Sequence, residues 1–270
     1  MLSFENYKRK YQAGEIDNEH FFATVAKHDY KQRMLSVIPA KLDVYPFYIQ
    51  HNLPHARLLY HRSIRQPKPL FLPARFALKA VNGEACFGTF LICDGVDLRS
   101  GHAYPTFDSI RERYINWKGF KELSDDYVAE ELILSLAGNL PPDFRVHCFG
   151  KTKKVITNWR QHKSGHRVYD ENWKLLFNNS EFNDPPKQAM QDVLELAERT
   201  RAILDVPFVR IDLLWTLNRG ALLGELSRQP GNGTIPPRYN HKYPDEAIIL
   251  LKWMSYLWLE ATKEIYNSGV

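Results

Sequence analysis

The stretch FVRIDLLWTLNRGALLGELS, residues 208–227, has the pattern of a β-hairpin with an acidic side chain on each strand. Successive side chains of a strand point to opposite faces of a sheet. With the turn at residues 217–220, Asp212 lies directly opposite Glu225. Two like charges paired across a ladder destabilise a sheet, so the pattern favours a cation between them. Oxygen-only ligands suit magnesium, whose coordination is often completed by substrate phosphates.

The same hairpin is compatible with two arrangements that need no metal ion. In the first, Arg210, two residues before Asp212 on the same strand face, neutralises the two carboxylates. In the second, the turn is displaced by one residue, which moves every side chain of a strand to the other face. Asp212 and Glu225 then face apart and hold no metal ion.

The stretch DFRVHCFGKTKKVITNWR, residues 143–160, predicts a second hairpin with two chemically distinct faces. A turn at residues 150–153 pairs Arg145 with Asn158. One face then carries Asp143, Arg145, His147, Asn158 and Arg160, and the other carries Phe144, Val146, Cys148, Val155 and Trp159. Such segregation indicates that one face packs on a core and the other meets water or a ligand. The two arginines can hold phosphate or carboxylate oxygens bidentately, and a solvent-facing sheet with a cross-strand ion pair would produce the same pattern.

Lys79 stands near the end of the apolar stretch ARFALKAV, residues 74–81, just before a turn at Asn82-Gly83. A buried lysine is costly without a partner. Its ammonium group could reach phosphates bound under the glycine-containing loop, although no Walker A sequence is present. Glu130 and Glu131 open the segment EELIL and by themselves predict only surface carboxylates.

The remaining patterns predict an α+β protein with a largely antiparallel sheet. Strands are expected over residues 73–81, 86–92 and 126–134, and helices over 107–123, from the Asp184-Pro185-Pro186 cap onward, and over 245–266. Residues 1–68 have a helical and loop-like pattern, and HKSGH at 162–166 is expected to be a loop. The aromatic side chains of the last helix are expected to pack on the core or against a second copy in a homodimer.

Length and composition are those of an ordinary globular protein. The 270 residues are 44% hydrophobic and 25% charged, and the 13% of aromatic side chains argue against disorder. The longest apolar run, residues 247–259, is interrupted by Lys252 and is too short to span a bilayer. An N-terminus without an apolar signal core and three cysteines without metal-ligand spacing predict a cytoplasmic protein with no transmembrane segment.

The net charge of +5 is mild, and much of the excess lies in two stretches without acidic residues, 57–75 and 151–167. Charge runs are usually solvated surface. The alternative is a binding site for an anionic small molecule, such as a nucleotide phosphate or a sugar acid. Nucleic acid is not an expected partner, because no helix-turn-helix, zinc-finger or RNA-binding signature accompanies the charge.

Taken in order, four of these segments resemble the ATP-grasp superfamily. They are FALKAVNG around Lys79, EELIL at 130–134, the hairpin at 143–160, and VRIDLL…GELSRQPGNG at 209–233. The resemblance is greatest to the TupA-like ATP-grasp proteins of surface-polysaccharide and teichuronopeptide synthesis. It implies an α+β fold in which two lobes with mostly antiparallel sheets grip a nucleotide.

The resemblance also implies boundaries for these parts. They are a short, truncated N-terminal helical and loop region over residues 1–68, a small lobe over 69–130, and a large lobe over 131–270 that ends in a helix. The N-terminal region is shorter than the α/β domain that precedes the lobes in many ATP-grasp ligases.

Residue roles follow from the same resemblance. It implies that Lys79, Glu130, Glu131, Ile133 and Asp143 contact ATP, that Arg145 and Arg160 lie near the phosphates and the reacting carboxyl, and that Asp212, Glu225 and Ser227 hold magnesium. It also implies that the loop at 228–234 lies beside the γ-phosphate. The sequence departs from the superfamily pattern in two places: Ser227 stands where Asn is frequent, and Glu84-Ala85-Cys86 stand where more glycine is usual.

The implied activity is ATP- and magnesium-dependent ligation of a carboxylate to an amine through an acylphosphate, with release of ADP and phosphate. This chemistry needs charge neutralisation and alignment rather than a protein nucleophile. The implied partner is a small molecule or glycan with a carboxylate, which receives an amino acid or amine during surface-polysaccharide synthesis. Two alternatives stay open: a kinase for a sugar or glycan hydroxyl, and a non-catalytic glycan-binding protein on a degenerate ATP-grasp scaffold.

Overall fold

The computed structural model describes most of the chain, which divides into two compact units. The described residues are 1–16, 34, 37–69, 71–83, 87–120, 123–159, 165–228 and 245–267. The larger unit comprises Met1–Pro39, Pro142–Trp215 and Arg219–Val270, and the smaller comprises Ala40–Pro141 and Thr216–Asn218. Residues 40–68, which the residue pattern groups with the N-terminal region, therefore cluster with the smaller unit.

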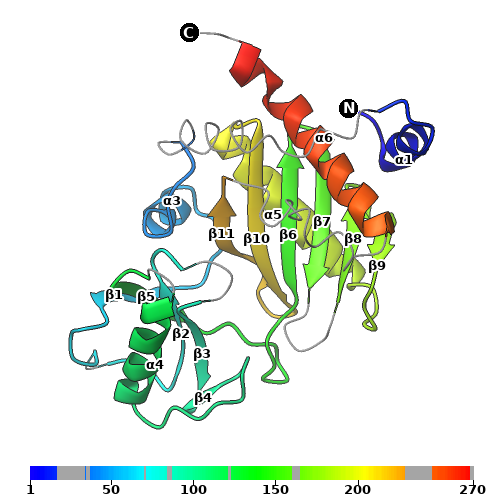
Figure 1. The fold of residues 1–270 in the computed structure, drawn as a ribbon. Coiled ribbons are helices and arrows are strands. Elements are labelled where there is room, and N and C mark those ends of the chain that lie inside the picture. The colour runs from blue at the N-terminus through cyan, green and yellow to red at the C-terminus, as the bar shows by residue number, and fades with distance from the viewer. Residues whose placement is uncertain are drawn as a thin grey trace. The chain divides into compact units, whose positions relative to one another are not determined.

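A five-stranded sheet with the order β1-β5-β2-β3-β4 forms the smaller unit (Figure 1). Its strands are β1 (Leu58–Ser63), β2 (Arg75–Ala80), β3 (Thr89–Cys93), β4 (Val96–Asp97) and β5 (Asp126–Glu131), and its helices are α3 (Val44–Gln50) and α4 (Phe107–Phe120). The strands and the helix expected between residues 73 and 134 are confirmed. Strand β1 lies where only helix and loop were expected, because its mostly half-buried residues show no clear apolar alternation.

The two faces of the smaller sheet differ in polarity along strand β2. Every second residue from Phe76 to Ala80 is buried in one cluster with residues of α4. The side chains between them point to the opposite face. The register of β2 with β5 places Lys79 and Glu130 on that opposite face, as diagonal neighbours.

A six-stranded sheet with the order β11-β10-β6-β7-β8-β9 forms the larger unit (Figure 1). Its strands are β6 (Asp143–Phe149), β7 (Lys153–Trp159), β8 (His166–Asp170), β9 (Leu175–Asn178), β10 (Phe208–Thr216) and β11 (Gly220–Ser227). Its helices are α1 (Phe4–Gln12), α5 (Lys187–Leu204) and α6 (Asp245–Asn267). Helices α5 and α6 lie on opposite faces of the sheet. Both expected hairpins and the two expected helices are confirmed.

Helix α5 covers one face of the larger sheet. Trp215, at the end of β10, donates a hydrogen bond from Nε1 to Asp192 Oδ2 of the helix, at 2.8 Å. Lys154 of β7, only 4% exposed, forms an ion pair with Glu198 of the helix. The residues that α5 buries are Ala189, Val193, Leu196, Ala197, Thr200, Arg201 and Leu204.

Helices α6 and α1 cover part of the other face, which α6 crosses diagonally (Figure 1). The sheet residues Phe149, Val155, Val168, Phe177 and Phe208 form one apolar cluster with these two helices. Trp253 of α6 donates from Nε1 to the carbonyl oxygen of Leu2 at 3.0 Å, which ties the helix to the segment that precedes α1.

The register of β6 with β7 differs by one residue from the expected one. Arg145 pairs with Thr157, not with Asn158, so only residues 150–152 form the turn. Gly150 has φ +63°, a left-handed conformation that glycine adopts without strain and that suits a three-residue turn. Because the side-chain period of a strand is two, Asn158 lies on the α5 face and is fully buried there.

Strands β8 and β9 extend the larger sheet beyond the expected hairpin. His166 begins β8 and pairs with Trp159, so the loop expected over HKSGH does not include it. Gly165 directly precedes the strand, and residues 162–164 lie outside the described part of the chain. With five and four residues, β8 and β9 are too short for a clear period-two pattern.

Candidate functional site

Charged side chains gather on the larger sheet, on the face opposite α5. The register pairs Arg210 with His147 and Asp212 with Arg145 across strands β10 and β6, and directly paired residues point to the same face. We call this group the polar sheet face. It consists of Asp143, Arg145, His147, Thr157, Arg210 and Asp212.

Arg210 and Asp212 form the best-defined contact of the polar sheet face. The guanidinium donates from Nε to Oδ1 at 2.7 Å and from Nη2 to Oδ2 at 2.9 Å, and the two side chains are 13% and 18% exposed. Burial lowers the pKa of Arg210, but Asp212, followed by the charges of Glu225 and Asp143, outweighs it and raises that pKa above its ordinary value. This ion pair corresponds to one of the two arrangements without a metal ion that the sequence allows, in which Arg210 neutralises the carboxylates.

Glu225 of β11 belongs to the same face as Asp212. A Cβ atom placed on Gly220 would lie 3.3 Å from Asp192 Oδ2, so Gly220 faces α5, as Trp215 does. Alternation along β11 then directs Glu225 away from α5. The charge of Glu225 also acts on Arg210, in agreement with this placement. Glu225 is exposed.

These oxygen ligands fit a hard divalent cation. Each carboxylate oxygen has two lone pairs, so Asp212 can accept both hydrogen bonds of Arg210 and still ligate a metal ion. Ser227, the last residue of β11, adds a hydroxyl on the face of Glu225 by the same alternation. Among the described residues, no three His, Cys, Asp or Glu side chains come together as a metal site. A cation here would therefore be bound by two carboxylates and a hydroxyl, with water or substrate phosphates as the remaining ligands.

Asp143 and Arg145 lie on β6, beside the Arg210–Asp212 pair. Arg145 Nη2 lies 3.8 Å from Asp143 Oδ2, and the side chain of Arg145 is 36% exposed. Arg145 also stands directly across the ladder from Asp212. An arginine in this position can bind an anionic group while its neighbours keep it fixed.

His147 is the buried imidazole of the polar sheet face and is 6% exposed. Burial, and next the positive charge of Arg210, lower the pKa of His147 to about 4. Its Nδ1 lies 3.4 Å from the carbonyl oxygen of Val155. At neutral pH the imidazole is therefore uncharged.

A second group of expected site residues lies in the smaller unit. Lys79 forms an ion pair with Glu130, whose side chain is only 8% exposed. Tyr45 of α3 donates its hydroxyl to Glu130 Oε2 at 2.6 Å. The sequence did not single out Tyr45, because helical spacing in residues 44–50 gives no sign of which strand residue it meets.

The other expected residues differ in how they are placed. Glu131 ends β5, and its backbone N–H donates to the carbonyl oxygen of Arg57 at 2.9 Å. Ile133 follows the strand and is 5% exposed, so EELIL is a strand only at its start. Arg160, Glu84-Ala85-Cys86 and most of the loop expected at 228–234 lie outside the described residues.

Arg228, directly after Ser227, fixes the end of β11. Its Nε donates to the carbonyl oxygens of Met34 and Ile38, at 3.1 and 3.0 Å. Ile38 is fully buried. The N-terminal part of the larger unit is thereby joined to the strand that carries Glu225.

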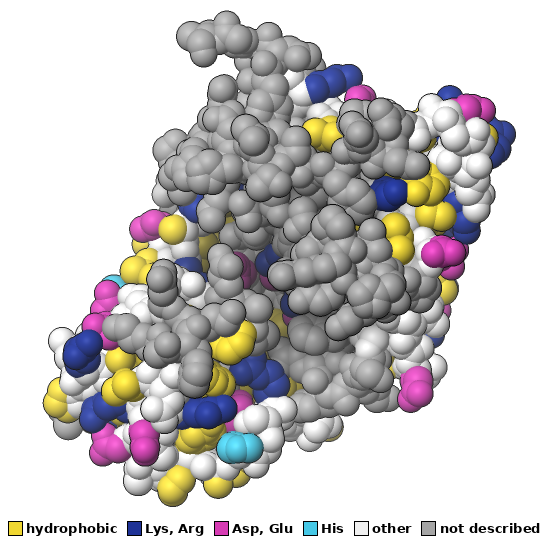
Figure 2. Space-filling view, in the orientation of Figure 1, with side chains coloured by type: hydrophobic (Ala, Val, Ile, Leu, Met, Phe, Trp, Pro, Cys, Tyr) yellow, Lys and Arg dark blue, Asp and Glu magenta, His cyan; other side chains and the backbone are white. Residues whose placement is uncertain are grey.

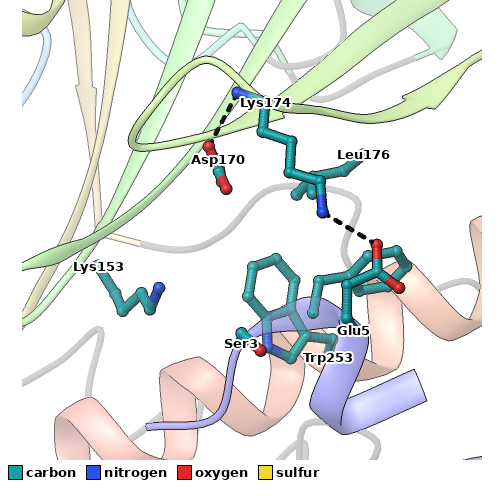
Figure 3. Close-up of a pocket in the computed structure, with 8 residues that line it drawn as sticks. Ser3, Glu5, Lys153, Asp170, Lys174, Leu176 and Trp253 are labelled. Atoms are coloured by element: carbon teal, nitrogen blue, oxygen red, sulfur yellow. Dashed lines mark hydrogen bonds and ion pairs between the residues drawn. The ribbon is translucent and has the colours of Figure 1, made fainter. Parts of the chain in front are cut away.

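A small cavity of about 50 Å³ lies elsewhere in the larger unit, and Figure 3 shows its lining. Lys174 borders it and contacts Glu5 through Nζ at 3.3 Å and Asp170 through its backbone N–H at 3.0 Å. The lining residues are Ser3, Phe4, Glu5, Lys153, Asp170, Lys174, Leu176 and Trp253. None of them belongs to the polar sheet face.

Surface charge in the smaller unit is mixed in sign. Figure 2 shows Lys and Arg side chains interspersed with Asp and Glu over the visible surface of this unit. Of the helices in the described part of the chain, none combines the length and the apolar character that crossing a bilayer requires.

Comparisons with known proteins agree with this architecture. A family model described as TupA-like ATP-grasp matches residues 68–246. The D-alanine–D-alanine ligase of Bacillus anthracis superposes with a TM-score of 0.50 at 12% identity, covering 85% of this chain and 69% of that one. A second structure of this ligase, described as complexed with ATP, gives a TM-score of 0.53 at 12% identity and covers 86% and 69%. The search of curated proteins gave no significant match.

At this level of identity the superpositions show the fold alone, and that fold is the α+β ATP-grasp fold. The family model spans roughly two thirds of the sequence and includes Lys79, the polar sheet face and both strands of the hairpin that carries Asp212 and Glu225. This chain belongs to the TupA-like ATP-grasp family.

Proposed function

We propose that this protein is an ATP- and magnesium-dependent ligase that joins a carboxylate to an amine. The observation that carries the proposal is the polar sheet face, where the Arg210–Asp212 pair, with Glu225 on the same face, combines two carboxylates with a fixed guanidinium. Such a set neutralises and aligns phosphates and carboxylates, which is what phosphoryl transfer requires of a protein.

Asp212, Glu225 and Ser227 are the proposed magnesium ligands. When bound, the ion would neutralise charge on the phosphates of the nucleotide. Arg210 fixes the Asp212 carboxylate through both oxygens, so this ligand is held in one orientation before any cation binds. Exposure of Glu225 leaves its carboxylate accessible.

The proposed ATP contacts are the residues that the family resemblance implies. Lys79 would bind phosphate oxygens, and Glu130, Glu131 and Ile133, at the end of β5, would contact the rest of the nucleotide together with Asp143. The support is that Lys79 is fixed by the buried Glu130 at one face of the smaller sheet. A lysine held in this way has already lost part of the conformational freedom that binding would otherwise remove.

Arg145 and Arg160 are proposed to hold the reacting carboxylate and the transferred phosphoryl group. A carboxylate oxygen of the substrate attacks the γ-phosphorus, the bond to the β-phosphate oxygen breaks, and ADP leaves. An amine then attacks the acyl carbon, phosphate leaves with the bonding electrons, and the amine loses a proton to solvent. Arg145, 36% exposed, can reach such an anion.

The proposed substrate is a sugar acid or another glycan carboxylate, in a cytoplasmic step of surface-polysaccharide synthesis. Family membership supports this choice. The mixed charge of the visible smaller unit also favours a small anion over a polyanion, which would need a surface of one sign.

The test is product analysis with purified protein, magnesium, ATP and panels of uronic acids and amino acids. A correct pair should release ADP and free phosphate together and form an amide, which mass spectrometry detects. Asp212→Asn and Glu225→Gln should abolish turnover, while Glu246→Gln, which changes an exposed carboxylate on α6, should leave it intact. Phosphate found on the product would identify a kinase, and undiminished turnover in both site variants would rule out the metal ligands proposed here.

A further inference from the structure

A short segment that precedes the matched family region makes two hydrogen-bonded contacts with the smaller sheet, both close to Lys79. The family model begins at residue 68, whereas Lys41 and Tyr45 lie just before and within α3. Tyr45 reaches Glu130, and Lys41 reaches the turn that follows β2. Both contacts are adjacent to Lys79, the proposed phosphate ligand.

Tyr45 fixes Glu130 on the side away from Lys79. Its hydroxyl donates to Oε2 at 2.6 Å, while Oε1 faces the ammonium group of Lys79 in the ion pair. Burial, and next the charge of Glu130, raise the pKa of Tyr45 well above its ordinary value, so the phenol keeps its proton and always donates. Both carboxylate oxygens of Glu130 are therefore engaged.

The contacts from Tyr45 to Glu130 and from Glu130 to Lys79 fix the position of the Lys79 ammonium group. A lysine side chain has a flexible four-carbon stem, and its position is defined by whatever holds the ammonium group. Glu130 is 6% exposed, and a buried charge must keep its hydrogen bonds to remain favourable. Loss of the Tyr45 hydroxyl leaves one oxygen of Glu130 without its donor, and the carboxylate and Lys79 then rearrange together.

Lys41 holds the backbone next to Lys79. Its Nζ donates to the carbonyl oxygens of Ala80 and Gly83, at 3.1 and 3.0 Å. The turn between these residues is closed by a hydrogen bond from the Gly83 N–H to the carbonyl oxygen of Ala80 at 3.1 Å. A Cβ atom on Gly83 would lie 2.5 Å from the carbonyl oxygen of Phe87, so the backbone packs closely here. A single ammonium group thus joins the end of β2 to the residue that closes the following turn.

We propose that Lys41 and Tyr45 are positioning residues of the nucleotide site, with Tyr45 acting through Glu130 on Lys79 and Lys41 acting on the turn after β2. The inference rests on the proposed function, because it takes Lys79 as a ligand of the ATP phosphates. It adds to the site a segment that the family match does not include.

The experiment is calorimetric titration of the full chain with the non-hydrolysable analogue AMP-PNP and magnesium, and with adenosine, which has no phosphates. Tyr45→Phe and Lys41→Met should each weaken AMP-PNP binding about tenfold, the effect expected for one lost hydrogen bond to a charged group. Adenosine binding should be unchanged by Lys41→Met, and in Tyr45→Phe it should fall less than AMP-PNP binding does, because Glu130 is also a proposed contact of the nucleoside. Lys41→Arg, which keeps the charge and the donors, should retain most of the affinity for AMP-PNP.

Tyr114→Phe is the matched control. It removes another buried tyrosine hydroxyl from the smaller unit, one that donates to the carbonyl oxygen of Ser124 at 2.8 Å. It should leave AMP-PNP binding unchanged. The inference is overturned if Tyr45→Phe and Lys41→Met bind AMP-PNP like the unchanged protein, or if they lose adenosine and AMP-PNP affinity equally. A failure of the unchanged protein to bind AMP-PNP would be a different result, which removes the proposed function itself.

Discussion

The guanidinium of Arg210 and the carboxylate of Asp212, two residues apart on one strand, are joined by two hydrogen bonds of 2.7 and 2.9 Å. Both side chains are mostly buried, so neither charge is well solvated without the other. Glu225 influences the same guanidinium from the neighbouring strand but is exposed. The two carboxylates among the proposed metal ligands therefore have unequal structural importance.

Asp212→Asn should destabilise the larger unit far more than Glu225→Gln. The first substitution leaves the mostly buried Arg210 without its anion, at a cost of about 2–4 kcal/mol in the free energy of unfolding. The second changes an exposed group and should cost less than about 0.5 kcal/mol. Urea unfolding followed by circular dichroism measures both, and equal losses would contradict the assignment of Asp212 as the main partner of Arg210.

The ion pair between Lys154 and Glu198 should respond asymmetrically to substitution. Lys154 is 4% exposed, whereas the side chain of Glu198 is 47% exposed. Glu198→Gln leaves a buried ammonium group uncompensated and should cost about 1–3 kcal/mol. Lys154→Met removes the buried charge and frees Glu198 to be hydrated, so it should cost less than about 1 kcal/mol. The free energy of unfolding in urea tests the order, and a larger loss for Lys154→Met would reverse it.

His147 should make the folded state less stable as the pH falls from 6.5 towards 4. Its folded pKa is lowered from 6.5 to about 4, so between these values the unfolded chain binds a proton that the folded chain does not. The stabilisation is fully present above pH 6.5, and about 2 kcal/mol of it is lost at pH 5.

The comparison that isolates this effect is His147→Gln against the unchanged protein, with unfolding measured from pH 7 to 4.5. The difference in unfolding free energy between the two should shrink as the pH falls, because Gln does not titrate. A difference that stays constant over this range would mean that His147 titrates normally.

Gly165 should tolerate no side chain, whereas Gly14 should accept one at modest cost. Both have positive φ, at +88° and +73°. A Cβ atom on Gly165 would lie 2.2 Å from the carbonyl oxygen of Asn179, and one on Gly14 would meet nothing within 4 Å. Gly14→Ala should therefore cost about 1 kcal/mol from backbone strain alone, and Gly165→Ala about 2–4 kcal/mol because overpacking adds to it. Thermal unfolding ranks the two, and similar midpoints would contradict the close approach of Gly165 to Asn179.

Apart from the short strands β4, β8 and β9, the order of strands and helices from residue 73 onward follows from residue patterns, whereas one register does not. The residue pattern of 143–160 allows turns of three or four residues equally well, and the alternation of polar and apolar side chains is kept in β6 either way. The choice is made by Gly150, whose positive φ and hydrogen bond to the carbonyl oxygen of Pro207 depend on the neighbouring strand. No local pattern contains that contact, so Asn158 was expected on the wrong face.

The candidate site could be predicted only where its residues are related by local sequence, and not where they meet from distant parts of the chain. Asp212 and Glu225 can be related through one hairpin, because their separation depends only on local alternation. Tyr45 and Glu130 are 85 positions apart, and a tyrosine in an aromatic helix gives no sign that it meets a carboxylate. Lys79 needed a partner, which the sequence indicated, but that partner is Glu130 of a neighbouring strand.

The position of α6 has a consequence for the order in which the larger unit is completed during synthesis. Its sheet can receive α5 as soon as β10 and β11 have been made, since α5 precedes both strands. Phe149, Val155 and Phe208, by contrast, are buried by helices α6 and α1. The hydrogen bond from Trp253 to Leu2 joins α6 to the segment before α1. That face of the sheet thus stays partly open to water until residues 245–267 have been synthesised, and the nascent protein carries an uncovered apolar surface up to that point.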